Sequence, residues 1–218
     1  FTTQSSSFLS TTFAAGESLT ANDAVYVLTA DATTTDITSN NTGVDEAAGT
    51  VARPRVAQSF NEASAYFLTT VGISIKKAGT PTDNLVVTLQ ADSAGAPSGT
   101  ALATVSIAGA NILSTYVTQV VNFAVPYTTA ASTKYWIVWA RSGASDSTNY
   151  YNINANSAGN YAGGAAATYD GTTWTDVAAQ DNHVILYTRG YAGDVFKADA
   201  SAFATASSTI GFAQSAVA

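Results

Sequence analysis

The sequence predicts an all-β protein built as an antiparallel β-sandwich, and three observations support this fold class. Runs of strand-like sequence are separated by clusters of turn-forming residues, such as 92–99. Apolar and polar residues alternate in several runs, most clearly around Val71, Ile73 and Ile75. The same region shows no helical period. Short strands with turns between them are typical of two stacked antiparallel sheets.

The segment 134–140 is predicted to be a central strand of this sandwich. Side chains alternate between the two faces of an extended backbone. The two sets are Tyr135, Ile137 and Trp139, and Trp136, Val138 and Ala140. Because both sets are apolar, the strand is expected in the middle of a sheet that packs on a second layer.

The other strands are predicted from the same pattern of strand-like runs bounded by turn-forming residues. We expect strands at 23–28, 56–60, 66–75, 85–91, 102–107, 116–123 and 183–187. Residues 29–50 are interpreted as a long loop or linker, and 142–180 as a polar stretch studded with aromatic residues. The first of these contains the sequon Asn40-Asn41-Thr42, a glycan acceptor only in a cell that glycosylates.

The composition narrows the class of function. Hydrophobic residues make up 46%, enough for a core, and charged residues only 11%, which suits an extracellular or assembled protein. A net charge of −7 with scattered basic residues argues against a nucleic-acid partner. The absence of cysteine excludes disulfides and thiolate metal sites. No apolar run is long enough for a membrane helix, so membrane insertion is not expected. The chain lacks methionine and starts at Phe1, so we expect a processed or partial product.

A series of segments in the middle of the chain carries a first resemblance. The series is AQSF (57–60), VGI (71–73), ADSAGAPSG (91–99), KYWIV (134–138), NYY (149–151) and YDGTTW (169–174). In this order it resembles a jelly-roll β-sandwich domain of the choice-of-anchor type, found in secreted bacterial proteins and phage-borne structural proteins. The resemblance implies a jelly-roll topology for the sandwich.

The two ends of the chain carry a second resemblance. GESLTANDAVYV (16–27) and GDVFKADA (193–200) are similar to the two halves of a small β module that recurs in tailed-phage capsid-decoration and tail proteins. In those proteins the halves are contiguous, so here the sandwich would be an insertion at the hairpin tip. The resemblance implies three parts: 1–50, an N-terminal arm with the first half of the module; 51–189, the sandwich; and 190–218, the second half.

No catalytic residues are predicted. The single histidine, His183, lies near Asp181, but a Ser-His-Asp triad needs a nucleophile on a strained elbow and no Gly-x-Ser-x-Gly motif occurs. We interpret it as a strand-edge imidazole that is bonded locally. The aspartates that could pair for glycoside hydrolysis lie in polar turns rather than in an apolar pocket. These are Asp146, Asp170, Asp176 and Asp181.

No metal site or cofactor is predicted, and Ca²⁺ stays open as an alternative. Asp83-Asn84, Asp92 and Asp181-Asn182 offer turn-borne oxygen atoms of the kind that Ca²⁺ binds. No EF-hand spacing is present, and Asp and Asn in turns are first of all turn formers.

The aromatic-rich stretch 149–174 is the candidate ligand-binding surface. Sugar rings stack on Tyr and Trp faces while amide and carboxylate groups hold the hydroxyls. The candidate glycan-binding residues are Tyr150, Tyr151, Asn152, Asn154, Tyr161, Tyr169 and Trp174. The alternative is that some of these aromatic residues cover the open end of the sandwich or pack against a neighbouring subunit.

The N-terminal segment is the candidate assembly element. It is polar with isolated apolar residues: Phe1, Phe8, Leu9 and Phe13. It is either a surface arm or edge strand, or an arm that docks on a neighbouring subunit, because exposed Phe side chains are poorly tolerated in water.

We therefore expect a non-enzymatic structural subunit at the surface of a virion (a phage-like capsid-decoration, fibre or tail component) or of a comparable extracellular assembly. Its partners would be copies of itself, other subunits and, as a further candidate, surface glycans. One alternative is an extracellular filament or adhesin subunit that assembles by strand addition of its N-terminal arm. Another is a carbohydrate-binding module.

Overall fold

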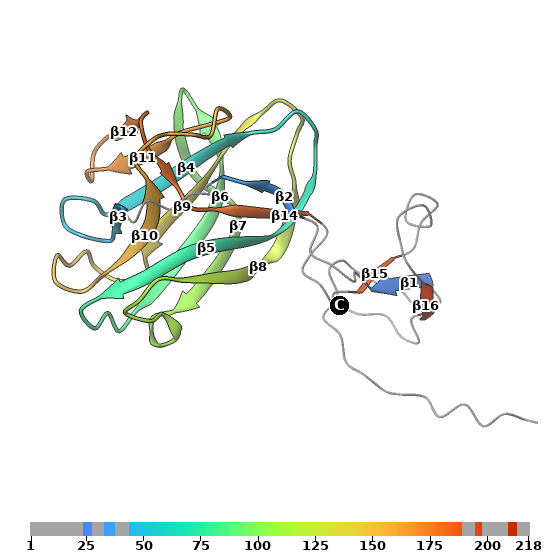
Figure 1. The fold of residues 1–218 in the computed structure, drawn as a ribbon, viewed down its shortest axis with the longest axis horizontal. Coiled ribbons are helices and arrows are strands. Elements are labelled where there is room, and N and C mark those ends of the chain that lie inside the picture. The colour runs from blue at the N-terminus through green and yellow to red at the C-terminus, as the bar shows by residue number, and fades with distance from the viewer. Residues whose placement is uncertain (1–23, 28–32, 38–43, 189–194, 198–208, 213–218) are drawn as a thin grey trace, which may run out of the picture. The chain divides into compact units, whose positions relative to one another are not determined.

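The computed structural model describes residues 24–27, 33–37, 44–188, 195–197 and 209–212 (Figure 1). These residues form β-strands and one short 3₁₀ helix, η1 (Gly109–Asn111), and contain no α-helix. The predicted all-β fold with an antiparallel sandwich is confirmed, whereas the jelly-roll order stays a prediction. The chain divides into two compact units, Ala32–Gly190 and a second unit formed by Phe1–Asp31 with Tyr191–Ala218.

The smaller unit contains a three-stranded antiparallel sheet. Its middle strand is β1 (Ala24–Val27), between β15 (Val195–Lys197) and β16 (Thr209–Phe212). Val25 lies opposite Lys197 on one side and opposite Gly211 on the other. A strand that precedes the sandwich in the sequence therefore pairs with two strands that follow it. The predicted arm residues Phe1, Phe8, Leu9 and Phe13 lie outside the described residues, as does the sequon Asn40-Asn41-Thr42.

The first layer of the larger unit is a six-stranded sheet with the predicted central strand near its middle. That strand, β9, pairs with β4 on one side and with β6 on the other. In sheet order the strands are β12 (Trp174–Val177), β11 (Ala166–Tyr169), β4 (Arg55–Asn61), β9 (Lys134–Arg141), β6 (Asn84–Ser93) and β7 (Ala96–Ala108).

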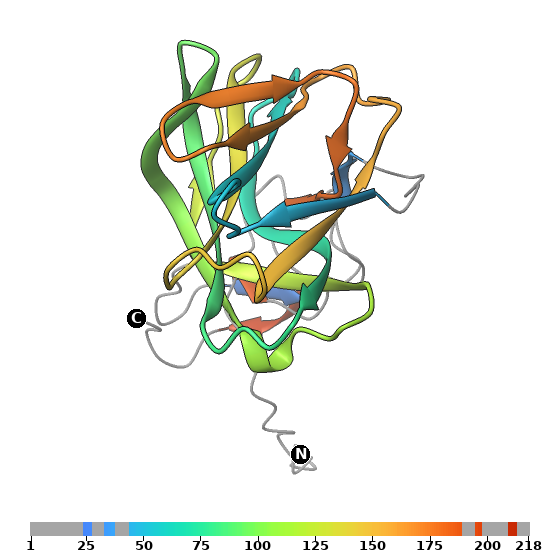
Figure 2. The same ribbon diagram turned by 90° about the vertical axis from the view of Figure 1, so that its left-hand side faces the viewer.

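The second layer is a seven-stranded sheet, seen with the first in Figures 1 and 2. Its main path is β13 (Asp181–Asn182), β10 (Tyr150–Asn156), β5 (Phe67–Ala78), β14 (Ile185–Thr188) and β2 (Thr33–Asp36). Two further strands branch from this path: β3 (Val44–Ala48) pairs with β10, and β8 (Val117–Thr128) pairs with β5.

The core lies between the layers and is filled by one face of each sheet. Leu85, Val87 and Leu89 of β6 meet Val71, Ile73 and Ile75 of β5 in a single buried cluster. On β9 the alternation is as predicted. Tyr135, Ile137 and Trp139 belong to this core, whereas Trp136 and Val138 form a second buried cluster with Ala57 and Ala167. The six-stranded sheet is therefore apolar on both faces near its centre.

The prediction of a long loop or linker at 29–50 is wrong for two segments, and the polar stretch 142–180 also contains strands. Strands β2 and β3 lie in the first range, and β10, β11 and β12 lie in the second. These strands are polar because side-chain partners inside the fold satisfy their buried polar groups. Glu46 of β3, for example, is 3% exposed and accepts hydrogen bonds from Arg53 and Gln180. Because these strands carry many polar residues, they resemble loops in sequence.

Candidate functional site

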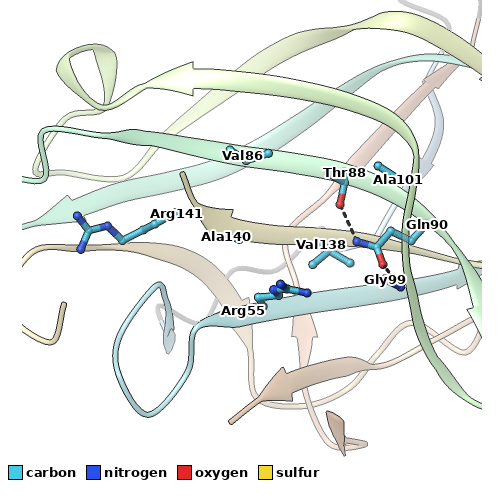
Figure 3. Close-up of a pocket in the computed structure, with 9 residues that line it drawn as sticks. All are labelled: Arg55, Val86, Thr88, Gln90, Gly99, Ala101, Val138, Ala140 and Arg141. Carbon is cyan, nitrogen blue, oxygen red and sulfur yellow. Dashed lines mark hydrogen bonds between the residues drawn. The ribbon is translucent and has the colours of Figure 1, made fainter. Parts of the chain in front are cut away.

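The outer face of the six-stranded sheet, which points away from the core, carries a shallow groove. Alternation along β4, β9 and β6 places Arg55, Val138 and Thr88 on this face. The groove has a volume of about 240 Å³ (Figure 3). Its lining residues are Arg55, Val86, Thr88, Gln90, Gly99, Ala101, Val138, Ala140 and Arg141.

The neutral polar groups in the groove are held in place by one another. The Gln90 side chain donates from Nε2 to Thr88 Oγ1 at 3.0 Å and accepts from the Gly99 backbone N–H at 2.8 Å (Figure 3). Gln90 is only 5% exposed, so its amide is fixed rather than available. The Thr88 hydroxyl accepts from Gln90 and keeps its own proton to donate.

Arg55 is the charged group of the groove that is not neutralised. Its guanidinium carbon lies 5.4 Å from the centroid of the Tyr169 ring, a cation–π geometry. No carboxylate among the described residues is within ion-pair distance of it. The other described arginines are paired, Arg53 with Glu46 and Arg141 with Asp83. Arg55 therefore presents a fork of N–H donors toward the groove without an internal acceptor.

A small apolar layer supports this face. Trp136 is 1% exposed and clusters with Ala57, Val138 and Ala167, and Trp174 packs against them. The Trp136 indole N–H donates to Asp92 Oδ1 at 2.8 Å. Because this layer is packed and hydrogen-bonded, the groove has a firm floor.

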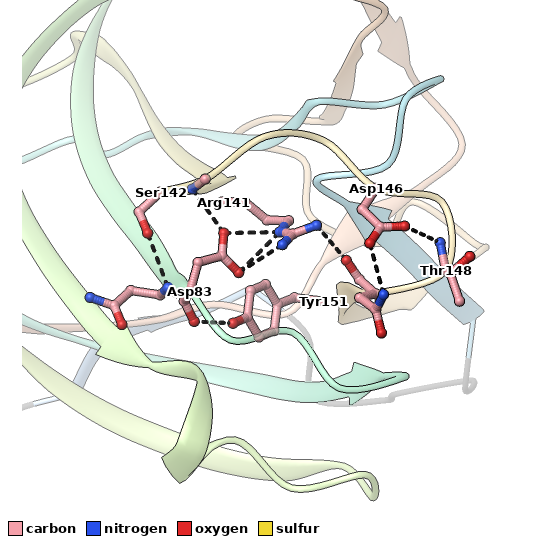
Figure 4. A network of polar contacts seen from close by, with 9 residues as sticks. Asp83, Arg141, Ser142, Asp146, Thr148 and Tyr151 are labelled. Carbon is pink, nitrogen blue, oxygen red and sulfur yellow. Dashed lines mark hydrogen bonds and ion pairs between the residues drawn. The ribbon is translucent and has the colours of Figure 1, made fainter.

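A dense polar network lies at the end of β9 that Arg141 occupies (Figure 4). Arg141 donates from Nε and Nη2 to the Asp83 carboxylate at 3.0–3.1 Å, and Gly143 N–H donates to Asp83 Oδ2 at 2.8 Å. Tyr151 donates its hydroxyl to the Asp83 carbonyl oxygen at 2.6 Å. The Arg141 and Asp83 side chains are 9% and 15% exposed. The network thus locks the turn before β6 to the end of β9.

The electrostatics of this network favour the charged carboxylate. Burial alone would raise the pKa of Asp83, but the hydrogen bonds from Arg141 and Gly143 outweigh it, so the pKa lies below the ordinary value. Burial, followed by the nearby Asp83 charge, raises the pKa of Tyr151 to about 12. At neutral pH Asp83 is therefore ionised and forms an ion pair with Arg141, while the Tyr151 hydroxyl is protonated.

A second polar cluster connects the two sheets internally. The backbone N–H of Asn182 donates to Gln58 Oε1 at 2.7 Å, and Gln58 Nε2 donates to Asp181 Oδ1 at 3.2 Å. Gln180 Nε2 donates to Glu46 Oε2 at 2.6 Å. All five residues are buried. Their polar groups face one another rather than a cavity, so the cluster links the two sheets and is not a binding site.

The predicted glycan-binding residues on β10 are enclosed in the fold. Tyr151 is fully buried in the core. Asn152 and Asn154, on the opposite face of the strand, are 4% and 6% exposed, and Asn154 donates to Ser74 Oγ at 3.3 Å. Tyr150 is half-buried at the start of the strand, opposite Ala78.

The remaining members of the predicted set divide between two places. Tyr161 is half-buried and donates its hydroxyl to Glu62 Oε1 at 2.7 Å. Tyr169 and Trp174 lie opposite each other on β11 and β12, with ring centroids 5.2 Å apart. These two alone reach the outer face of the six-stranded sheet, beside Arg55.

His183 and the aspartates considered for metal binding accept hydrogen bonds within the fold, whereas Asp176, considered for catalysis, is exposed. His183 is 5% exposed, and its Nδ1 accepts from the Ser74 backbone N–H at 3.0 Å, where β10 and β5 diverge. Asp83, Asp92 and Asp181 each accept hydrogen bonds from neighbouring residues. Within the described ranges, no three His, Asp or Glu side chains form a cluster suited to a metal ion.

The sequence patterns did not predict the groove residues, because no motif distinguishes them from other strand residues. Arg55, Val86, Thr88 and Gln90 occupy the outward positions of two ordinary strands. Strand alternation predicts that Val86, Thr88 and Gln90 share one face of β6. Arg55 joins them only because β4 and β6 both pair with β9, and β4 and β9 are about 80 residues apart in the sequence.

The chain matches no protein-family model and no curated protein sequence. Of the described segments, none forms a helix of the length and hydropathy that crossing a membrane requires.

Proposed function

We propose that this chain is a non-enzymatic structural subunit at the surface of a virion or of a comparable extracellular assembly. The main observation that supports this proposal is the pairing of β1 with β15 and β16. It makes the sandwich an insertion between strands of a small β base, the arrangement expected if the flanking segments assemble and the sandwich projects.

The engagement of the polar residues supports a role without catalysis. A general acid or base needs a titratable group that can reach a substrate. The histidine and the buried carboxylates of the sandwich are instead bonded to neighbours inside it. The low share of charged residues, 11%, is also consistent with a protein that functions as part of an assembly.

The test is assembly of the purified chain, followed by electron microscopy and light scattering. The full chain is expected to form particles or fibres, or to decorate a partner assembly. Deletion of residues 1–13 is expected to abolish assembly while the sandwich stays folded by circular dichroism. A quadruple variant with serine at Phe1, Phe8, Leu9 and Phe13 separates the apolar side chains from mere length. Unchanged assembly of both variants would contradict the role of the arm, and a monodisperse monomer under all conditions would contradict the proposed function.

A second candidate is a filament subunit that assembles by strand addition, and the edges of the sandwich favour it. Within the described residues, β7 pairs only with β6, and β8 pairs only with β5. Neither strand contains a charged residue, and charged residues are a usual protection of exposed strand edges. Replacing Thr118 of β8 with Lys should then reduce polymerisation without unfolding the monomer. Normal polymerisation of that variant would count against β8 as the acceptor.

A further inference from the structure

We propose that the groove beside Arg55 binds a carboxylate-bearing sugar residue. This would add recognition of an acidic glycan to the structural role, and it stands on observations that are independent of that role. The ligand would place its carboxylate on the guanidinium of Arg55 and its ring against Val86 and Ala140.

The charge of the groove selects an anion. The protein carries a net charge of −7, yet the groove is lined by no acidic side chain. Its two cations differ: Arg141 is neutralised by Asp83 at 3.0 Å, whereas Arg55 has only the Tyr169 ring as a partner among the described residues. A planar guanidinium with unused donors matches a carboxylate in a two-point contact. Tyr169 supports the guanidinium from one side and limits its freedom.

The remaining lining suits a small ring with hydroxyl groups. Val86 and Ala140 make a small apolar surface, and Thr88 offers a hydroxyl donor. The volume of about 240 Å³ lies below the usual range for drug-sized ligands, so one sugar residue is the appropriate scale. Trp174 lies against Tyr169 at the β11 side and offers a face on which a neighbouring sugar could stack.

A peptide strand is a poorer fit to this groove. Strand addition uses the unpaired backbone groups of a sheet edge. The groove instead lies mainly over β4, β9 and β6, which have hydrogen-bonded partners on both sides, and the edge strand β7 contributes only Gly99 and Ala101 to its lining. Recognition here must come from side chains, as it does for sugars.

The experiment is a binding titration of the full chain by isothermal calorimetry and ligand-observed NMR. The probes are α2,3-sialyllactose, an oligomer of galacturonic acid, and neutral lactose. Binding of one acidic probe with at least tenfold weaker binding of lactose is expected. Binding only of sialyllactose would indicate a terminal sialic acid, and binding only of the oligouronate would indicate a uronate polysaccharide.

Variants locate the binding in the groove. Arg55→Gln is expected to weaken binding of the acidic probe at least tenfold, and Arg55→Lys less, because lysine keeps the charge but not the fork. Lys77→Gln is the matched control, since it removes the same charge from a residue of the other sheet and should leave binding within twofold. Near-ultraviolet circular dichroism checks that each variant is folded.

The proposal is overturned if neither acidic probe binds, if lactose binds equally well, or if Arg55→Gln and Lys77→Gln have the same effect. Failure of assembly in the experiments above leaves this outcome unaffected, because the titration needs only the folded sandwich within the full chain.

Discussion

The two faces of strand β9 use similar residues in opposite ways. Each face carries one buried tryptophan, Trp139 toward the core and Trp136 away from it, and two arginines, Arg141 and Arg55, line the groove beside the strand. At the inner end, Arg141 is fixed by Asp83 and is 9% exposed. On the outer face, Arg55 is exposed and rests on Tyr169. The Arg141 charge is therefore neutralised within the fold, while the Arg55 charge has no acidic partner among the described residues.

This difference separates stability from recognition in one sheet. A buried ion pair whose donors and acceptors are all used has nothing left for a ligand. An arginine held by an aromatic ring keeps its hydrogen-bonding capacity and has less freedom to lose when a ligand arrives. Changes on the inner side should therefore affect folding, whereas changes at Arg55 should affect binding.

The largest effect is expected from Trp139→Ala. Trp139 is fully buried between the sheets, so its removal leaves a cavity that the packed layers cannot close, at a cost of about 3–5 kcal/mol. Trp136→Ala should cost less, about 3 kcal/mol, at the lower end of that range, because Trp136 lies in the smaller outer cluster rather than between the sheets. Urea unfolding followed by circular dichroism measures both. Equal costs would break the distinction between the two faces.

Asp83→Ala should have the next largest effect. It leaves the Arg141 guanidinium without its carboxylate at a site where Arg141 is 9% exposed, which should lower the free energy of unfolding by about 3 kcal/mol. The control is Asp176→Ala, an exposed position on β12, where a change within about 0.5 kcal/mol is expected. If both variants unfold at the same urea concentration, Asp83 does not hold the end of β9.

The apolar strands were predictable from the sequence, and the polar ones were not. Alternation identified β9 and β5 because half of their side chains enter a core. Strand β10 does alternate, with Tyr151, Ile153 and Ala155 between its asparagines, but asparagine is typical of turns and loops, so the segment was interpreted as part of a polar stretch. Those asparagines are buried through partners supplied by distant segments, and no local pattern reports such partners.

The candidate site was harder to predict because it depends on strand pairing. Aromatic residues drew the prediction to Tyr150 and Tyr151, yet Tyr151 packs in the core. Tyr169 and Trp174 were included in the prediction and do lie on the outer face. Arg55 was not, because a single exposed arginine on a strand has no distinguishing feature until Tyr169 is placed opposite it.

Conservative changes at the two tryptophans sharpen the comparison further. The Trp136 indole N–H donates to Asp92 at 2.8 Å, whereas the buried Trp139 Nε1 has no acceptor among the described residues. Trp136→Phe removes a hydrogen bond to a charged group, but Trp139→Phe removes an unpaired donor. Trp136→Phe should therefore be more destabilising than Trp139→Phe, by about 1–2 kcal/mol in urea unfolding. The reverse order would mean that loss of ring volume in the core outweighs hydrogen bonding.

The smallest effect concerns pH and again depends on the inner end of β9. The folded-state pKa of Asp83 is depressed, so its ionised form stabilises the fold at all pH values above the unfolded pKa of about 4. That contribution is lost as the pH falls from about 4 through the folded-state pKa. Asp83→Asn should therefore flatten the decline in stability below about pH 4, measured by urea unfolding at stepped pH.

Asp170 also has a lowered pKa, caused by backbone hydrogen bonds from Thr173 and Thr172, but it lies in an exposed turn. Asp170→Asn should leave more of the acid decline in place than Asp83→Asn, because the protonation that weakens the fold is the one that releases Arg141.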